Sequence, residues 1–491
     1  MNKKLLSAAV LLGLSSAATA VNVNKDGLGS VLLYPYYTTN GDKFTNIEVV
    51  NTTNQTKAVK VRFIEGVNSW EVLDFNLYMS PYDVWTAVVY NDGTGTFVKT
   101  TDTSCTAPEL STQPLSPALI EAYSESHKDP GSLSSADRLR EGYLEILEMG
   151  VITDPVVAAA VKHDATGVPK DCSVIRDAWS NGYWSTSPTV VTGDQAQNQI
   201  AAPAGGLYGA GTIVDTTNGS AAGYDATAVE SFYTAPAHAN PGSSFPNIAG
   251  RIQSGGNVVD TSASKTSNVI VNNQVVTTNW ADPADAMSAV LMASGVYNSY
   301  ALDAGIVTDW VITFPTKHAY VNERTDQAGT VGGLFAGQFG FLPAGVTGMT
   351  TGKAPFASGF TVPLNMTIYN REEQLKNSNI QFSPFLTTQN GISYEVNVLE
   401  FGKGGASVFK SNLANRVNDT DFENGWASVN FSGGSLVAPL GPNNGSTHTY
   451  KGYPVVGFAM QELQGGTSSA GSLTNYGALY NHKYNRSVTV S

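Results

Sequence analysis

Alternating apolar and polar positions recur along most of the chain and predict a mainly β protein. In an early stretch, Val59 and Val61 alternate with Lys60 and Arg62. A period of two residues is typical of a strand with one buried face, and we expect the polar face to lie in solvent. Short strands of this kind, separated by polar turns, predict an N-terminal immunoglobulin-like β-sandwich over residues 21–104.

The same alternation returns in the last part of the chain. Val362, Leu364, Met366 and Ile368 occupy every second position, which is the pattern of a strand that packs one face on a core. We therefore expect a C-terminal β domain over residues 291–491. It forms either a second sandwich or the remaining strands of one large shared sandwich.

Helical periodicity is confined to shorter segments between these two β regions. Residues 105–185 predict a small, mixed helical insertion, within which residues 140–151 fit a helix slightly better than a strand. Residues 186–290 are rich in Gly, Ala, Ser and Asn, and they predict an arm with short strands plus one helix. That helix begins at Asp282, because an aspartate followed by proline is a frequent helix start.

The first residues have the pattern of a signal peptide, which we assign to residues 1–20. Lys3 and Lys4 precede a short apolar run, and small residues follow up to Ala20. The run is too short to span a bilayer, and no later stretch is long and apolar enough to do so. We therefore expect an exported protein without a transmembrane segment, extracellular or at the cell surface, with the periplasm as the alternative location.

The net charge of the chain limits the classes of molecule that it can bind. Charged residues make up 14% of the chain and the net charge is −13, which becomes −15 when Lys3 and Lys4 leave with the signal peptide. A chain this acidic repels phosphate backbones, and no cluster of Lys or Arg provides a local exception. We therefore expect no nucleic acid among the partners.

Cys105 and Cys172 are the two cysteines of the sequence. In an exported protein an even pair predicts a disulfide, which would close the helical insertion. A long loop closed in this way gains about 4 kcal/mol in the chain-entropy model. Two buried free thiols are the competing interpretation.

One acidic segment resembles a calcium loop. Asp419, Asp421 and Glu423 place oxygen ligands at alternate positions, as a Ca²⁺ loop does. The glycine stands one place late and no bidentate glutamate follows at the right spacing, so a plain turn between strands is the competing interpretation. We expect no other cofactor. Two further acids, Glu71 and Asp74, lie among strand residues and are expected to face solvent.

The motifs of common enzymes are missing from the sequence. No G-x-S-x-G elbow occurs, and none of the six histidines lies within five residues of another, which excludes an H-E-x-x-H zinc site. We therefore expect a protein that is not an enzyme. A secreted hydrolase, whose carboxylates would meet only through the fold, is the least favoured alternative.

Aromatic residues provide a candidate surface for binding sugars. The chain has seven tryptophans, among them Trp70, Trp85, Trp310 and Trp426, and exposed indoles could provide a platform for sugar rings. Packing in the core is the more frequent explanation. An adhesin or carbohydrate-binding protein that binds surface glycans is therefore the alternative function.

Four stretches resemble an uncharacterised family of secreted β-rich proteins of Gram-negative bacteria. They are residues 51–63, 73–85, 308–317 and 453–458. Because the stretches are spread along the chain, the resemblance is not to one borrowed domain. No activity is assigned to that family, so the resemblance implies an exported surface or matrix protein and no catalytic residue.

These observations together predict an extracellular structural protein of a Gram-negative bacterium: a surface-layer, fibre or matrix subunit that self-associates into a polymer. Val21 and Val23 lie in a short alternating segment at the expected mature N-terminus. We expect this segment to be free of the first domain, so that it could donate a strand to a neighbouring copy.

Overall fold

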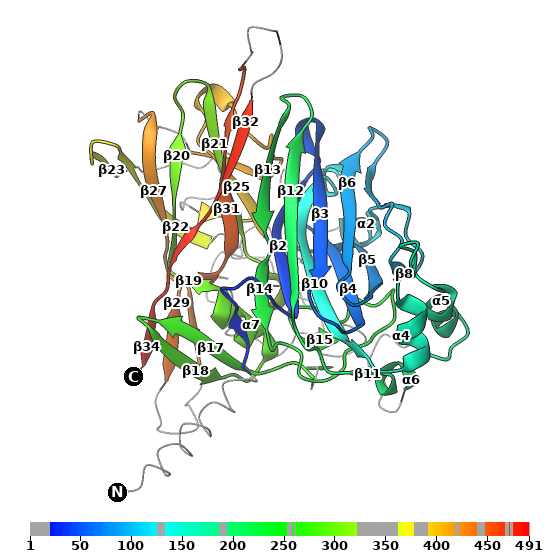
Figure 1. The fold of residues 1–491 in the computed structure, drawn as a ribbon. Helices are drawn as coiled ribbons and strands as arrows, with labels where there is room; N and C mark the ends of the chain where they lie inside the picture. Colours follow the sequence, from blue (N-terminus) through cyan, green and yellow to red (C-terminus); the bar gives the residue numbers. More distant parts are fainter. Residues whose placement is uncertain are drawn as a thin grey trace, which may run out of the picture.

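The chain is mainly β, as predicted, with 49% strand and 12% helix in the computed structural model. Most strands belong to four sheets that form two neighbouring halves (Figure 1). The predicted signal peptide lies outside the described residues except for Ala20. The structure describes residues 20–124, 133–185, 194–252, 258–259, 262–321, 362–377, 391–417, 422–438, 447–466, 471 and 475–490.

Two antiparallel sheets form the N-terminal half. The first sheet contains, in spatial order, β1 (Asn22–Val23), β14 (Thr227–Glu230), β2 (Val31–Thr38), β10 (Glu141–Ile152), β4 (Lys57–Glu65), β5 (Glu71–Met79) and β8 (Cys105–Ala107), with β11 (Ile200–Ala201) paired to β10. The second sheet contains β13 (Ser220–Asp225), β12 (Leu207–Asp215), β3 (Lys43–Asn51), β6 (Val84–Asn91), β7 (Thr96–Lys99) and β9 (Thr112–Pro114). The two sheets share a core, in which the ring centroids of Phe75 on β5 and Trp85 on β6 lie 5.6 Å apart.

Two more sheets form the C-terminal half. The third sheet contains β23 (Leu375–Asn377), β22 (Val362–Asn370), β27 (Asn424–Phe431), β20 (Gly295–Ala301) and β33 (Lys483–Asn485), with β24 (Gly391–Ile392) paired to β22. The fourth sheet contains β26 (Ala414–Arg416), β25 (Val396–Glu400), β21 (Ile306–Thr313), β31 (Val456–Leu463) and β32 (Tyr476–Asn481). Its pairings are antiparallel except that of β25 with β26.

Short strands and helices surround the four sheets. The strands are β15 (Arg251–Ile252), β16 (Val258–Val259), β17 (Thr266–Val271), β18 (Gln274–Asn279), β19 (Met292–Ala293), β28 (Ser435–Val437), β29 (His448–Lys451), β30 (Tyr453–Pro454) and β34 (Val488–Val490). The helices are η1 (Asn40–Asp42), α2 (Ala118–Ser124), α3 (Ser135–Arg138), α4 (Pro155–Val161), α5 (Ser173–Ser180), α6 (Gln195–Asn198), α7 (Pro283–Leu291), α8 (His318–Val321) and η4 (Lys403–Gly405). Over the described ranges, no helix has the length and apolar character needed to cross a membrane.

The hydrophobic cores of the two halves are continuous. Val311 of β21 and Phe458 of β31 belong to the same buried cluster as Val59 of β4. A second buried cluster combines Leu147 of β10 with Trp310 of β21. Since neighbouring residues of β21 reach both clusters, each half buries apolar surface of the other, and this burial favours their association.

The slight preference for a helix over residues 140–151 is wrong, because this segment is strand β10. It lies between β2 and β4 in the first sheet, and all of its residues are buried. The strand carries three buried glutamates, Glu141, Glu145 and Glu148, whose spacings of four and three residues match a helix, so periodicity alone favoured the wrong element.

The polar face of the first sheet is covered, so the prediction that it lies in solvent is wrong. Lys60 and Arg62 are buried. Lys60 Nζ pairs with Asp74, Arg62 Nε lies 2.6 Å from Glu71 Oε2, and the carbonyl of Asn240 accepts from Lys60 Nζ at 3.1 Å. The segment after β14 thus covers this face, and ion pairs compensate the buried charges.

Residues 186–290 contribute β12, β13 and β14 to the two N-terminal sheets instead of forming an arm. Glycine allows close packing in β12, since a Cβ on Gly209 would lie 1.9 Å from the hydroxyl of Tyr34. The predicted helix is confirmed as α7, where the side chain of Asp282 accepts from the backbone N–H of Ala284 at 2.9 Å. Small side chains here therefore indicate tight packing rather than a free segment.

The predicted disulfide is confirmed. Cys105 on β8 is joined to Cys172, which directly precedes α5, and their Cα atoms lie 5.2 Å apart. The bond ties α4 and α5 to the edge strand of the first sheet. The mixed helical insertion expected at residues 105–185 is thus held against that sheet, although it also supplies the central strand β10.

Candidate functional site

Only part of the predicted calcium loop can be placed. Asp419 and Asp421 lie outside the described residues, whereas Glu423 is exposed and directly precedes β27. Among the residues that the structure describes, no group of three or more His, Cys, Asp or Glu side chains could hold a metal ion. The calcium loop therefore stays a prediction.

The predicted donor segment is part of the chain's own fold. Val21 is fully buried, its N–H donates to Thr266 O at 2.8 Å, and its carbonyl accepts from Asn268 N at 2.8 Å. Val23 pairs with Val229 on β14. The prediction that Val21 and Val23 are free of the first domain is wrong, because the segment pairs with β14 and bridges it to β17.

Among the tryptophans, Trp426 differs from the others because its side chain is exposed. It is 41% exposed on β27, and its ring stacks on that of Tyr369 on β22 with centroids 4.3 Å apart. Tyr297 on β20 lies 6.4 Å from Trp426 between ring centroids. These three rings form an aromatic row across the third sheet. The other tryptophans are buried: Trp70, Trp85, Trp179, Trp184, Trp280 and Trp310.

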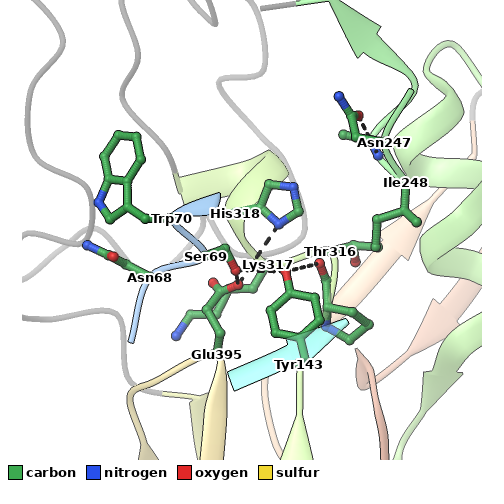
Figure 2. A network of polar contacts seen from close by, with 12 residues as sticks. Asn68, Ser69, Trp70, Tyr143, Asn247, Ile248, Thr316, Lys317, His318 and Glu395 are labelled. Carbon is green, nitrogen blue, oxygen red and sulfur yellow. Dashed lines mark hydrogen bonds and ion pairs between the residues drawn. The ribbon is translucent and has the colours of Figure 1, made fainter. Parts of the chain in front are cut away.

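A network of polar contacts lies where the two halves meet, around Glu395 (Figure 2). Glu395 directly precedes β25 in the C-terminal half, and its side chain is fully buried. The hydroxyl of Ser69, from the N-terminal half, donates to Glu395 Oε2. The hydroxyl of Tyr143 on β10 lies 2.9 Å from Ser69 Oγ and donates to Pro315 O at 3.3 Å. Side chains from both halves therefore converge on one buried carboxyl.

The turn between β4 and β5 places Ser69. The backbone N–H groups of Val67, Asn68 and Trp70 donate to the carboxylate of Glu65 at 2.8, 3.0 and 3.0 Å, so the turn wraps around this buried side chain. Ser69 has a φ of 61°, a left-handed conformation that serine seldom adopts. The wrapped turn holds this conformation and directs the serine hydroxyl toward the C-terminal half.

Two basic side chains of the C-terminal half flank Glu395. Lys317 is fully buried, and His318 Nδ1 lies 3.9 Å from Glu395 Oε2 (Figure 2). Burial raises the pKa of Glu395 to about 8, although the charge of Lys317 opposes this effect. Glu395 is therefore largely protonated at neutral pH, and its contact with Ser69 joins two neutral groups.

Backbone hydrogen bonds reinforce this junction. Val396 N donates to Gly66 O at 2.9 Å, and Glu395 N donates to Val67 O at 3.3 Å. A Cβ on Gly66 would lie 2.6 Å from Leu413 Cδ1. The absence of a side chain at Gly66 thus lets the β4–β5 turn approach the edge of the fourth sheet closely.

A second buried carboxylate makes the same kind of contact in the opposite direction. Glu141 of β10 accepts hydrogen bonds from Ser411 Oγ at 2.6 Å and from Asn412 N at 2.7 Å, both in the C-terminal half. The hydroxyl of Tyr36 on β2 donates to Glu141 at 2.7 Å. Burial raises the pKa of Glu141, whereas these hydrogen bonds lower it.

A third contact joins the second and fourth sheets. Ser220 on β13 donates to the buried carboxylate of Glu462 on β31. Nearby, the rings of Tyr224 on β13 and Phe458 on β31 stack with centroids 5.0 Å apart. We call the three pairs the serine–carboxylate contacts; they are Ser69–Glu395, Ser411–Glu141 and Ser220–Glu462.

The serine–carboxylate contacts have the chemistry of a structural joint. Each links a hydroxyl of one half to a carboxyl of the other, and the three carboxyl side chains are buried. A substrate would have to separate the two halves to reach them. Their chemical role is therefore to satisfy buried polar groups only when both halves are in place.

Sequence reasoning missed all three contacts, although one local signal was present. Glu141 lies in β10 together with Glu145 and Glu148, Glu462 lies in β31, and Glu395 directly precedes β25. A charged residue in such a position needs a buried partner. The serine partners carry no comparable signal, because serine is common throughout this chain.

Comparisons with known protein families, with curated proteins and with solved structures found no match to this chain.

Proposed function

We propose that this chain is an exported structural protein, a subunit of an extracellular surface layer, fibre or matrix of a Gram-negative bacterium. The observation that carries the proposal is the set of serine–carboxylate contacts. They join two β halves into one body, and a subunit that repeats in a lattice or fibre needs one fixed shape. The resemblance to secreted β-rich proteins agrees with this role.

The physical basis is the high cost of leaving a buried polar group without a partner. Losing one partner of a buried hydrogen bond costs about 1–3 kcal/mol, which is more than the net gain from forming it. Any other orientation of the two halves would leave Glu141, Glu395 and Glu462 without their serine partners. The contacts therefore select one relative orientation, which hydrophobic burial alone does not select.

We also propose that each half is an immunoglobulin-like sandwich in the broad sense of two packed, mostly antiparallel sheets. The shared core of the first and second sheets supports this for the N-terminal half. The single disulfide and the signal-peptide pattern support export to an oxidising compartment. N-terminal sequencing of the protein recovered from culture medium, cell surface and periplasm tests export; we expect Val21 as the first residue, and intact Met1 would contradict it.

Negative-stain electron microscopy tests the structural role. Purified mature protein is imaged over a range of concentrations, together with the surface of cells that express the gene and of cells that lack it. We expect regular arrays or fibres that disappear with the gene. Monomers at all concentrations, together with an unchanged cell surface, would contradict the proposal.

A specific observation favours glycan binding as a second candidate function. Trp426, Tyr369 and Tyr297 form an aromatic row with an exposed indole, and the apolar faces of sugar rings pack on such rings. Because the other tryptophans are buried, a ligand at this row should change the fluorescence of Trp426. Titration with a glycan panel tests this, with Trp426→Phe as the control variant. Flat titrations across the panel would remove this candidate.

A further inference from the structure

A groove of about 760 Å³ opens where β1, β17 and β33 approach one another. Val23 and Lys25 line one part of it, and Ile270 at the end of β17 lines another. Lys483 lies on β33 and Arg486 directly follows this strand. These two residues line the part of the groove that belongs to the C-terminal half. The volume of the groove lies within the range of pockets that hold a ligand or a short peptide segment.

The groove carries positive charge although the protein is acidic. Lys25 and Lys483 are exposed, and the half-buried Arg486 donates from Nη1 to Val290 O at 2.6 Å. In the part of the chain that the structure describes, none of these three cations has a carboxylate within 4.0 Å. Burial lowers the pKa of Arg486, and Asp225 is the acidic residue among those that line the groove. An acidic ligand would therefore relieve uncompensated charge. We call Lys25, Lys483 and Arg486 with their surroundings the basic groove.

A sheet edge borders the basic groove. β33 is the last strand of the third sheet and pairs only with β20 within that sheet. An edge strand presents backbone N–H and C=O groups that a strand of another chain can pair with. Ile270, 52% exposed, adds apolar surface beside these groups. The groove therefore suits an extended segment that carries both acidic and apolar side chains.

The opposite edge of the same sheet offers such a segment. The hairpin between β22 and β23 exposes Glu372, Glu373 and Leu375, with Arg371 beside them. Asn370 Oδ1 accepts from the N–H of Glu372 at 3.0 Å, which stabilises the turn. Figure 1 shows β23 at the outer margin of the molecule, at the upper left. We call Glu372, Glu373 and Leu375 the acidic tip.

We propose that the acidic tip of one copy docks in the basic groove of the next copy, so that β23 of the first copy continues the third sheet of the second beyond β33. This inference rests on the proposed structural function and names its partner as a second copy of the chain. The two surfaces differ, so the contact is head-to-tail. Such a contact leaves a free tip and a free groove at the ends and extends into a filament unless the rotation closes a ring.

Two double variants of the mature protein test the docking by sedimentation velocity at low ionic strength, where exposed charges are least screened. The groove variant is Lys25→Glu with Lys483→Glu, and the tip variant is Glu372→Lys with Glu373→Lys. All four side chains are exposed, so we expect the thermal midpoint to be unchanged. The matched control is Lys99→Glu with Lys403→Glu, which changes the net charge as the groove variant does but at exposed lysines outside the groove.

We expect wild type and control to form species larger than a monomer, each variant alone to stay monomeric, and an equimolar mixture of the two variants to form species larger than a monomer again. In the mixture the intact tip of the groove variant meets the intact groove of the tip variant, and the reversed charges of the altered groove and the altered tip are complementary as well. Variants that assemble like wild type, or a mixture that stays monomeric, would overturn the docking but leave the structural function standing. A wild type that never assembles would overturn both.

Discussion

Glu395 shows how a single buried carboxyl can make stability depend on pH. Its ordinary pKa of 4.5 is raised to about 8 by burial in the folded state. The stability that follows from this shift is fully present below about pH 4.5 and is lost as pH rises from there to about 8, since over this range the unfolded chain releases the proton while the folded state keeps the carboxyl protonated. Urea unfolding at pH 5, 6.5 and 8 measures this loss. We expect Glu395→Gln to lose less stability than wild type over this range, and parallel curves would contradict the assignment.

An exposed glutamate provides the control for the pH dependence of unfolding. Glu372 lies in the exposed hairpin turn, so Glu372→Gln removes a carboxyl without changing a buried one. The pH dependence of this variant should match that of wild type.

Ser69 tests the junction from the other half. Ser69→Ala removes the hydroxyl that donates to Glu395 and leaves the buried acceptor with one partner fewer. We expect the free energy of unfolding to fall by about 1–3 kcal/mol. Ser180→Ala, at an exposed site on α5, should change it by less than about 0.5 kcal/mol. Equal effects of the two substitutions would show that Ser69 has no special structural role.

At the scale of the element, β10 depends on a glycine where it meets β4. A Cβ on Gly142 would lie 2.0 Å from Ile64 O, a backbone atom that cannot turn away. We expect Gly142→Ala to lower the free energy of unfolding by about 1–3 kcal/mol, the usual cost of overpacking, as measured by urea unfolding. Gly242→Ala is the control, because nothing lies within 4 Å of its Cβ position. A neutral Gly142→Ala would contradict the close approach of β4 and β10.

The disulfide provides the second test at this scale. It closes a sequence separation of 67 residues, for which the chain-entropy model gives about 4 kcal/mol. We expect the double variant Cys105→Ser with Cys172→Ser to lose stability of this order, with limited proteolysis starting near α4 and α5. Wild type treated with a reductant should behave like the variant. Proteolysis that begins elsewhere would show that the bond does not hold these helices.

The sequence indicated the β class and several individual strands correctly, and its errors have a common physical origin. Alternation identified the strand around Val59 and Val61, but it could not show that a distant segment covers the face with Lys60 and Arg62. The same limit applies to the helix expected around Tyr143, because burial on both faces removes the alternation. The local sequence pattern thus shows which residues are apolar, but it does not show which polar residues become buried.

At the scale of the whole molecule, the candidate site could not be found from the sequence because its partners are far apart along the chain. Ser69 and Glu395 are separated by 326 positions, and Ser220 and Glu462 by 242. No spacing rule links residues at such distances. The cysteine pair was predictable because only one pairing exists, whereas the chain offers many serines for each buried glutamate.

The proposed structural role requires the two halves to form one body. Differential scanning calorimetry of the purified mature protein tests this directly, since a single cooperative unit unfolds in one transition whose calorimetric and van't Hoff enthalpies agree. We expect one transition for wild type, and a second transition to separate from it when Ser69→Ala, Ser220→Ala and Ser411→Ala are combined. Two resolved transitions in the wild-type protein would contradict the claim.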